Sequence, residues 1–230
     1  MKLSAVLLFV FICAACMRNT TIGEQYIGKP YVNNPLGEGV APDADPLVRF
    51  DAFDCTTFVE TTLADGNLEK LTKIRYKDGV ANFINRNHFI ETDWLSNNSN
   101  ILTDVTSKYG RTAVRRVKIN RAEWLKRNYG IDDTATIKTV DLRYIPYNAV
   151  KNIDNANPLI VLFIGDKYKD TKILGTDLAV MHMGFLLPGG ILRHASSDLG
   201  RVVDVDFYEY VANRQKSPHN LGIMLLEIKR

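Results

Sequence analysis

The chain has 230 residues, of which 46% are hydrophobic and 24% are charged. These proportions exclude a disordered chain, a collagen-like repeat and a multi-pass membrane protein, and one large domain of this length buries a core without needing disulfides. Lysine and arginine number 29 against 26 acidic residues, so the net charge is only +3, and we expect no nucleic-acid partner.

The N-terminus has the pattern of an export signal. Lys2 precedes thirteen almost wholly apolar residues, 3–15, a run too short for a membrane span of about 20 residues. The two alanines before Cys16 resemble a bacterial lipobox, although Cys13 stands where such motifs usually carry leucine. We therefore expect a signal peptide over residues 1–15 and lipidation of Cys16. The mature chain would be exported, periplasmic and membrane-anchored. Plain cleavage near residue 15 is the alternative.

Removal of this signal leaves Cys55 as the one cysteine that is not terminal. Exported proteins usually pair their cysteines. An unpaired cysteine in such a protein is either a small buried hydrophobe or a reactive thiol. Its neighbours in the sequence must decide between the two.

The expected elements follow in chain order. Residues 17–50 are rich in glycine, proline and asparagine and are expected to form ordered loop. A helix is expected from Asp54, as N-cap, to the stop signal at residues 65–67, and residues 68–130 mix short helices with a strand. Further helices are expected at Arg121–Tyr129 and from Phe207, and strands at Ala113–Ile119, Thr136–Tyr144, Leu159–Ile164, Leu178–Leu187, Ile191–Ser196 and Leu221–Lys229. A helix first and a sheet later indicate the α+β class, in a single domain over residues 16–230.

Cys55 lies in the first turn of its expected helix. Free N–H groups and the positive end of the helix dipole favour a thiolate there. The same amides could stabilise an oxyanion formed by attack on a carbonyl. The alternative is a packed thiol on an amphipathic helix.

A thiol nucleophile needs a base, and two of the four histidines are candidates. His182 and His194 lie on consecutive strands joined by Pro188-Gly189-Gly190. A hairpin loop centred on Pro188 would place the two histidines directly opposite each other, with Cβ atoms about 5 Å apart. A shift of half a residue would put them on opposite faces of the sheet. In the first register, Cys55 as nucleophile, His182 as base and His194 as its orienting residue form a cysteine-hydrolase triad.

Three segments resemble motifs of the NlpC-type papain-like cell-wall peptidases: residues 54–59 (DCTTFV), 182–185 (HMGF) and 193–196 (RHAS). Residues 28–32 (GKPYV) resemble the segment of that family whose tyrosine lies beside the nucleophile. The chain is most similar to a branch of N-acetylmuramoyl-L-alanine amidases, through residues 56–60, 75–79 and 93–94. This resemblance implies a papain-like core in which an antiparallel sheet packs on the cysteine helix. It also implies that Tyr31, Asp54, Arg75 and Trp94 contact the substrate or the oxyanion.

Cys55 and His182 are 127 positions apart, much further than in NlpC-type endopeptidases, so residues 67–135 are expected to form a large insertion. The insertion favours an amidase that cuts between muramic acid and L-Ala in peptidoglycan fragments. Its aromatic residues would stack on the sugar, or would form the core of the insertion. On this reading the enzyme needs no cofactor and acts as a monomer.

Three alternatives remain open at this point. The first is a γ-D-glutamyl–diamino-acid endopeptidase of the same superfamily. The second is a zinc site built from Cys55, His182 and His194. The third is a non-catalytic lipoprotein that binds cell-wall sugars.

Overall fold

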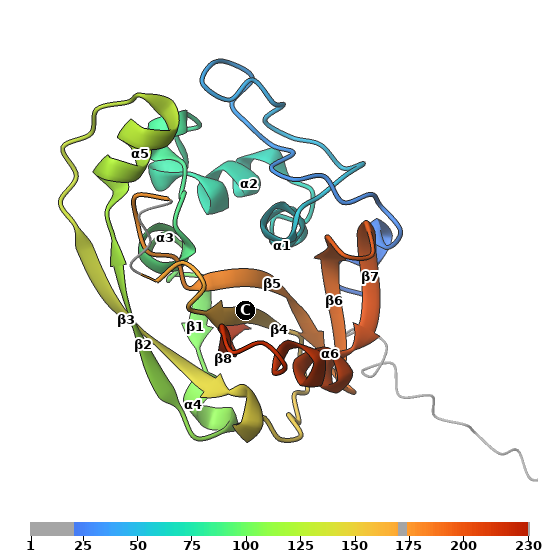
Figure 1. The fold of residues 1–230 in the computed structure, drawn as a ribbon. Helices are drawn as coiled ribbons and strands as arrows, with labels where there is room; N and C mark the ends of the chain where they lie inside the picture. The colour runs from blue at the N-terminus through green and yellow to red at the C-terminus, as the bar shows by residue number, and fades with distance from the viewer. Residues whose placement is uncertain (1–20, 170–173, 230) are drawn as a thin grey trace, which may run out of the picture.

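The structure is a computed structural model that describes residues 21–169 and 174–229 (Figure 1). The predicted signal peptide and Cys16 lie outside these ranges. Within them, no helix is both long enough and apolar enough to span a bilayer.

Most of the predicted elements are confirmed, several of them with the same bounds. The helices are α1 Cys55–Leu63, α2 Leu68–Arg75, α3 Leu95–Asn97, α4 Thr106–Tyr109, α5 Arg121–Tyr129 and α6 Phe207–Arg214. The strands are β1 Leu102–Asp104, β2 Ala113–Ile119, β3 Lys138–Pro146, β4 Leu159–Gly165, β5 Val180–Leu187, β6 Ile191–Ser196, β7 Arg201–Asp206 and β8 Asn220–Ile228. The sequence patterns did not predict α2, α4, β1 or β7.

The strands form one antiparallel sheet, so the predicted α+β class is confirmed. Its strand order is β2-β3-β8-β4-β5-β6-β7, and β1 pairs with β8 outside this path. In Figure 1, α1, α2 and α3 lie on one side of the sheet and α6 on the other. The hairpin of β2 and β3 extends one edge of the sheet.

Alternation along the central strand β4 explains these two layers. Successive side chains of a strand point to opposite faces, and all seven residues of β4 are buried. Ile160, Leu162 and Ile164 belong to the hydrophobic cluster that contains Phe58 of α1. Leu159, Val161 and Phe163 belong to a second cluster, which contains residues of α6.

Helix α1 begins as predicted, because Asp54 caps it. The Asp54 carboxylate accepts a hydrogen bond from Thr57 N at 2.7 Å, and the Thr57 hydroxyl accepts one from Asp54 N at 3.0 Å. This reciprocal capping box satisfies free N–H groups of the first turn. The helix then packs against β5 and β6, where the ring of Phe58 meets that of Phe185 edge-on at 5.7 Å.

The predicted register of the histidine hairpin is wrong by one residue pair. Phe185 pairs with Arg193 and Leu187 with Ile191, so the loop is centred on Gly189 rather than on Pro188. Gly189 and Gly190 have φ angles of 83° and 76°, and glycine adopts this left-handed conformation at little cost, which fixes the turn there. The histidines are therefore offset diagonally. They stay on one face because the offset moves the pairing by two positions.

The expected insertion, residues 67–135, contains α2 to α5 and the strands β1 and β2. Four of its aromatic residues, Tyr76, Phe83, Phe89 and Trp94, are at most 5% exposed. Phe89 and Trp94 pack in the main hydrophobic cluster, together with residues of α1 and the sheet. The alternative, in which these four residues stack on a sugar, is wrong for them.

Candidate active site

Cys55 lies where α1 meets two diverging strands. The pairing of β5 with β6 ends at Phe185 and Arg193, so the segments that carry His182 and His194 are not joined by backbone pairing. Met183 and Cys55 both pack in the cluster on the α1 side of the sheet. The thiol therefore sits against the strand segment that carries His182.

The two histidines contact each other directly. His182 Nε2 and His194 Nδ1 are 2.7 Å apart, and the two residues are 8% and 2% exposed. The ring of His182 also lies 5.6 Å from that of Phe163, on the α6 side of the sheet. The hairpin thus brings the predicted pair together despite the shifted register. Within residues 21–169 and 174–229, no hydrogen bond joins either histidine to the thiol.

The position two residues after His182 leaves no room for a residue larger than glycine. A Cβ atom at Gly184 would lie 2.8 Å from His194 Cβ and 2.8 Å from the carbonyl oxygen of Arg193. Real Cβ atoms do not approach so closely, so a side chain here would push β6 away. The glycine lets His194 approach the strand that carries His182.

Burial keeps both the thiol and the imidazoles uncharged. Desolvation, with a smaller effect from the Asp54 carboxylate, raises the pKa of the Cys55 thiol to about 12, although the N–H of Met183 acts in the opposite direction. Burial also lowers the pKa of His182 well below its ordinary value, and that of His194 to about 4. The site therefore holds a neutral thiol and two neutral imidazoles, so a reaction must begin with transfer of the thiol proton.

Tyr31 lies beside the nucleophile, as the resemblance implies. It forms a parallel bridge with Phe53, two residues before Cys55. Burial, with contributions from Cys55 and Asp54, raises the pKa of Tyr31 to about 12. The phenol therefore remains a hydrogen-bond donor. Asp54 serves instead as the helix cap described above.

Two of the expected substrate contacts need correction. Trp94 is fully buried, and Arg75 is 5% exposed. The Arg75 guanidinium lies 2.7 Å from the Glu60 carboxylate of α1 and donates to the carbonyl oxygen of Leu36, also at 2.7 Å. Neither side chain presents a free surface to a ligand, and Arg75 instead ties α2 to the cysteine helix.

Tyr210 of α6 also contacts the histidines, and Arg214 contacts Tyr210; neither residue was expected from the sequence. The ring of Tyr210 lies 5.2 Å from that of His194 and 6.1 Å from that of His182. Arg214 donates to the Tyr210 hydroxyl. The signal that could have found them is their spacing, because positions i and i+4 of a helix share a face.

The geometry gives no support to a zinc site. Among the described residues, no three His, Cys, Asp or Glu side chains are grouped as metal ligands. Two nitrogens of the histidines face each other at 2.7 Å, whereas ligands of one metal ion must all face the ion. The donor set therefore does not fit zinc in this arrangement.

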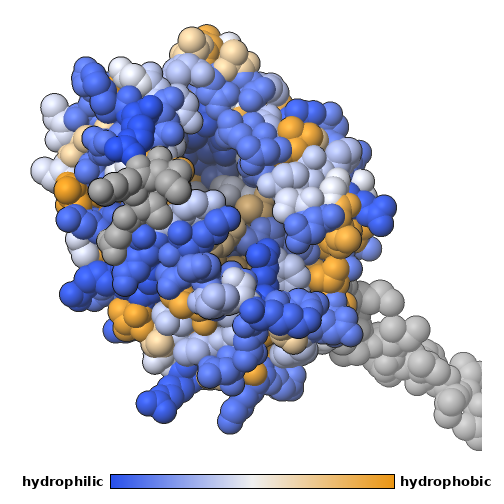
Figure 2. Space-filling model, viewed as in Figure 1, coloured by the Kyte–Doolittle hydropathy of each residue, from blue (hydrophilic) through white to orange (hydrophobic). Residues whose placement is uncertain are grey.

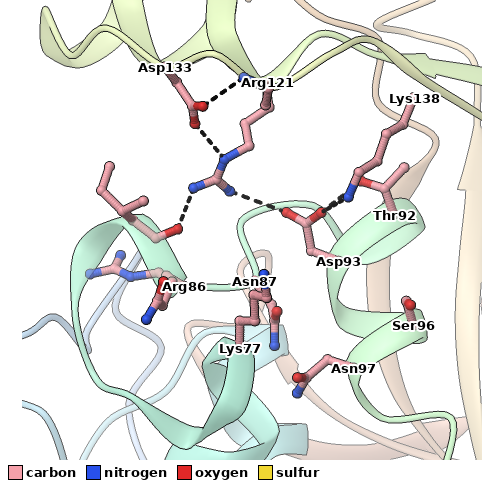
Figure 3. A pocket seen from close by; sticks show the side chains of 13 residues that line it. Lys77, Arg86, Asn87, Thr92, Asp93, Ser96, Asn97, Arg121, Asp133 and Lys138 are labelled. Carbon is pink, nitrogen blue, oxygen red and sulfur yellow. Dashed lines mark hydrogen bonds and ion pairs between the residues drawn. The ribbon is translucent and has the colours of Figure 1, made fainter.

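The insertion contains a separate polar cavity of about 430 Å³ (Figure 3). Arg121 braces it by donating to the carbonyl oxygen of Ile84 and to the carboxylates of Asp93 and Asp133. Lys77, Ser96, Asn97 and Lys138 also line it. In Figure 2, hydrophilic side chains surround a hollow on this face of the molecule. This cavity could not be predicted from the sequence, because several short segments that are far apart in the chain form its lining.

Comparison with known proteins places the chain in a family and shows the same fold in solved structures. The model of the AmiA-like family, described as N-acetylmuramoyl-L-alanine amidase-like, matches residues 21–221. The chain is similar to a DUF1460-family protein of Legionella pneumophila, with 25% identity, a TM-score of 0.82 and coverage of 94% of this chain and 89% of that one. It shares its fold with an N-acetylmuramoyl-L-alanine amidase of Bacteroides uniformis, with 23% identity, a TM-score of 0.69 and coverage of 91% and 97%. Comparison with curated protein sequences gives no match.

Proposed function

The chain belongs to the AmiA-like family of N-acetylmuramoyl-L-alanine amidase-like proteins, and from this membership we propose that it hydrolyses the amide between N-acetylmuramic acid and L-Ala in peptidoglycan fragments. The family supports a cell-wall amidase-like enzyme. The observation that carries the finer proposal is the direct contact of His182 with His194, on the two strands against which the helix that begins at Cys55 packs.

In the proposed mechanism, Cys55 is the nucleophile. Nε2 of His182 contacts His194, so Nδ1 of His182 is the nitrogen that accepts the thiol proton. The thiolate then attacks the lactyl carbonyl carbon. Amides at the start of α1 and the phenol of Tyr31 would donate hydrogen bonds to the oxyanion. Hydrogen bonds between a nucleophile and its base commonly tighten only when substrate binds.

The tautomer of the histidine pair follows from this role. For Nδ1 of His182 to accept a proton, the hydrogen of the neutral ring must be on Nε2, which then donates to His194 Nδ1. His194 must therefore be neutral and must act as an acceptor. When His182 becomes an imidazolium, this hydrogen bond becomes charge-assisted and stronger.

The remaining steps of the proposed reaction need no cofactor. The His182 imidazolium gives its proton to the L-Ala nitrogen as the C–N bond breaks, which leaves a thioester between Cys55 and the lactyl carbonyl. Water then attacks the thioester carbonyl as His182 accepts a proton from it, and the C–S bond breaks as the His182 imidazolium returns that proton to the Cys55 sulfur. The products are the free carboxyl group of the sugar and the peptide amine, and the thiol is regenerated.

The insertion supports the amidase over the endopeptidase of the same superfamily. Its polar cavity, rather than an aromatic platform, would interact with hydroxyl and carboxylate groups of the substrate at Lys77, Ser96 and Asn97. Binding energy from such remote groups positions the amide at the nucleophile. Hydrolysis should therefore depend on the sugar.

We expect the enzyme to release the intact stem peptide from N-acetylmuramoyl-peptides and to leave sugar-free stem peptides uncut. Mass spectrometry of the two digests measures this, with the Cys55→Ala protein as the matched control. Release of L-Ala–D-Glu from a sugar-free stem peptide would instead identify the endopeptidase. Binding of the N-acetylmuramoyl-peptide without turnover of either compound would identify the non-catalytic lipoprotein that binds cell-wall sugars.

We also propose that residues 1–15 direct export and that Cys16 carries a lipid, so that the enzyme works at a periplasmic membrane surface. The pattern of the first sixteen residues supports this proposal. Its substrates would be peptidoglycan fragments that reach that surface.

A further inference from the structure

Helix α6 places two side chains against the histidine pair from the side of the sheet opposite α1. Tyr210 lies one turn before Arg214, and its ring packs against His194, His182 and Phe163 at centroid distances of 5.2, 6.1 and 5.0 Å. Arg214 Nε donates to the Tyr210 hydroxyl at 3.0 Å, and the guanidinium carbon lies 5.0 Å from the centre of the ring. The two residues form one unit on this side of the site, where they line a pocket of about 500 Å³ together with His194.

We propose that Tyr210 and Arg214 are positioning residues: the ring of Tyr210, held by Arg214, keeps both imidazoles in place against the sheet, and the Arg214 cation opposes a second positive charge at the pair. The proposal rests on the proposed function, because it concerns the same histidine pair. It assigns to α6 a part in the reaction that neither the motifs nor the fold family specify.

The role follows from the hydrogen bond between the histidines. His194 must offer an unprotonated Nδ1 to His182, and a proton on that nitrogen would end the interaction and turn two donors toward each other. A fixed guanidinium opposes the arrival of a second positive charge nearby. Burial is the largest cause of the lowered pKa of both histidines, and Arg214 lowers both further.

The other titratable groups around the histidine pair either raise the pKa of His194 or are uncharged. Asp198 and Asp204, near β6 and β7, raise the pKa of His194, yet the net direction is down. Tyr147 faces Arg214, and Cys55 faces Tyr210. Burial raises the pKa of both tyrosines and of the thiol, so these groups are uncharged. Asp204 is itself paired with Arg193, which donates two hydrogen bonds of 2.7 Å to its carboxylate. Arg214 is the cation that lowers the pKa of both histidines.

The hydroxyl of Tyr210 fixes the position of the Arg214 guanidinium. It accepts from two nitrogens of the guanidinium, and the ring below that hydroxyl is half-buried between the helix and the histidines. Replacing Tyr210 with phenylalanine would keep the packing and remove the anchor of the charge. Substitutions of Tyr210 and of Arg214 can therefore test the effects of packing and of charge separately.

The test compares the wild type with Arg214→Gln, Arg214→Lys and the matched control Lys216→Gln, which removes an exposed charge just beyond α6. We expect Arg214→Gln to raise the pKa of His194, measured by NMR titration of the imidazoles, by about one unit. The acidic limb of the kcat/KM profile should move to higher pH by a similar amount, with little change at pH 8. Arg214→Lys should restore the limb, and Lys216→Gln should leave it in place.

Unchanged imidazole titration and an unchanged acidic limb in folded Arg214→Gln would overturn the proposal, as would a shift that Arg214→Lys does not reverse. If Arg214→Gln fails to fold, Tyr210→Phe provides the test, with a smaller shift in the same direction expected and no shift overturning the proposal. A wild type that titrates as expected but hydrolyses no muramoyl amide would refute the proposed function and leave the NMR test of Arg214 intact.

Discussion

Cys55→Ser should fold normally and lose amide hydrolysis by roughly three orders of magnitude or more. The reason is that a serine hydroxyl is far less acidic and less nucleophilic than a thiol, and the site supplies a neutral imidazole rather than a strong base. The measurement is product formation from a muramoyl-peptide, alongside the far-UV circular dichroism and thermal midpoint of both proteins. Substantial turnover by folded Cys55→Ser would rule out the cysteine mechanism.

The histidine variants complete this test. His182→Ala should be as inactive as Cys55→Ser, whereas His194→Ala should retain measurable activity, because His194 orients the base and forms no bond to the substrate. A reversed ranking would mean that the two roles are exchanged. A Gly184→Ala variant serves as a structural control, since its methyl group would displace His194 without removing any reacting group.

The second large effect concerns stability. Arg75→Met should lower the free energy of unfolding by about 3–5 kcal/mol, because it leaves the carboxylate of Glu60 buried without its partner. Both side chains of this ion pair are at most 6% exposed, and the pair joins α2 to the helix that carries Cys55. Urea denaturation at pH 7 measures the change.

Two further proteins make this prediction specific. Lys73→Ala breaks the exposed pair with Glu69 on the same helix α2 and should leave the free energy of unfolding nearly unchanged. The double variant Glu60→Met/Arg75→Met removes both charges and should be more stable than Arg75→Met alone. If the single and the double variant were equally destabilised, loss of packing would explain the effect instead of an unpaired charge.

Local signals explain which parts of the fold could be predicted from the sequence. Helix α5 was predicted to the residue because Gly130 ends it in the left-handed conformation. Strands β2 and β6 were found because they carry the strand pattern between clear turn residues. The short strand β1 was missed, since its pairing with β8 joins residues more than a hundred positions apart.

The functional site also has parts that could be predicted from the sequence and parts that could not. Cys55 could be predicted from its place at a helix start, and His182 and His194 from a hairpin. The true register differs from the predicted one by two positions, so the two histidines still share a face of the sheet. The burial of Trp94 and Arg75 could not be predicted, because it depends on how the insertion folds over α1. Tyr210 and Arg214 were missed for the same kind of reason, since only the packing of α6 on the sheet brings them to the histidines.

The most direct test of the central claim is the identity of the acyl group on Cys55 during turnover. The enzyme is mixed with an N-acetylmuramoyl-peptide, quenched in acid within milliseconds and digested, and the peptide that contains Cys55 is weighed. The proposed mechanism predicts an added N-acetylmuramoyl group, linked through its lactyl carbonyl to the sulfur and absent from the Cys55→Ser protein. An added L-Ala–D-Glu-containing acyl group, or turnover with no acyl group on Cys55 at any quench time, would contradict it.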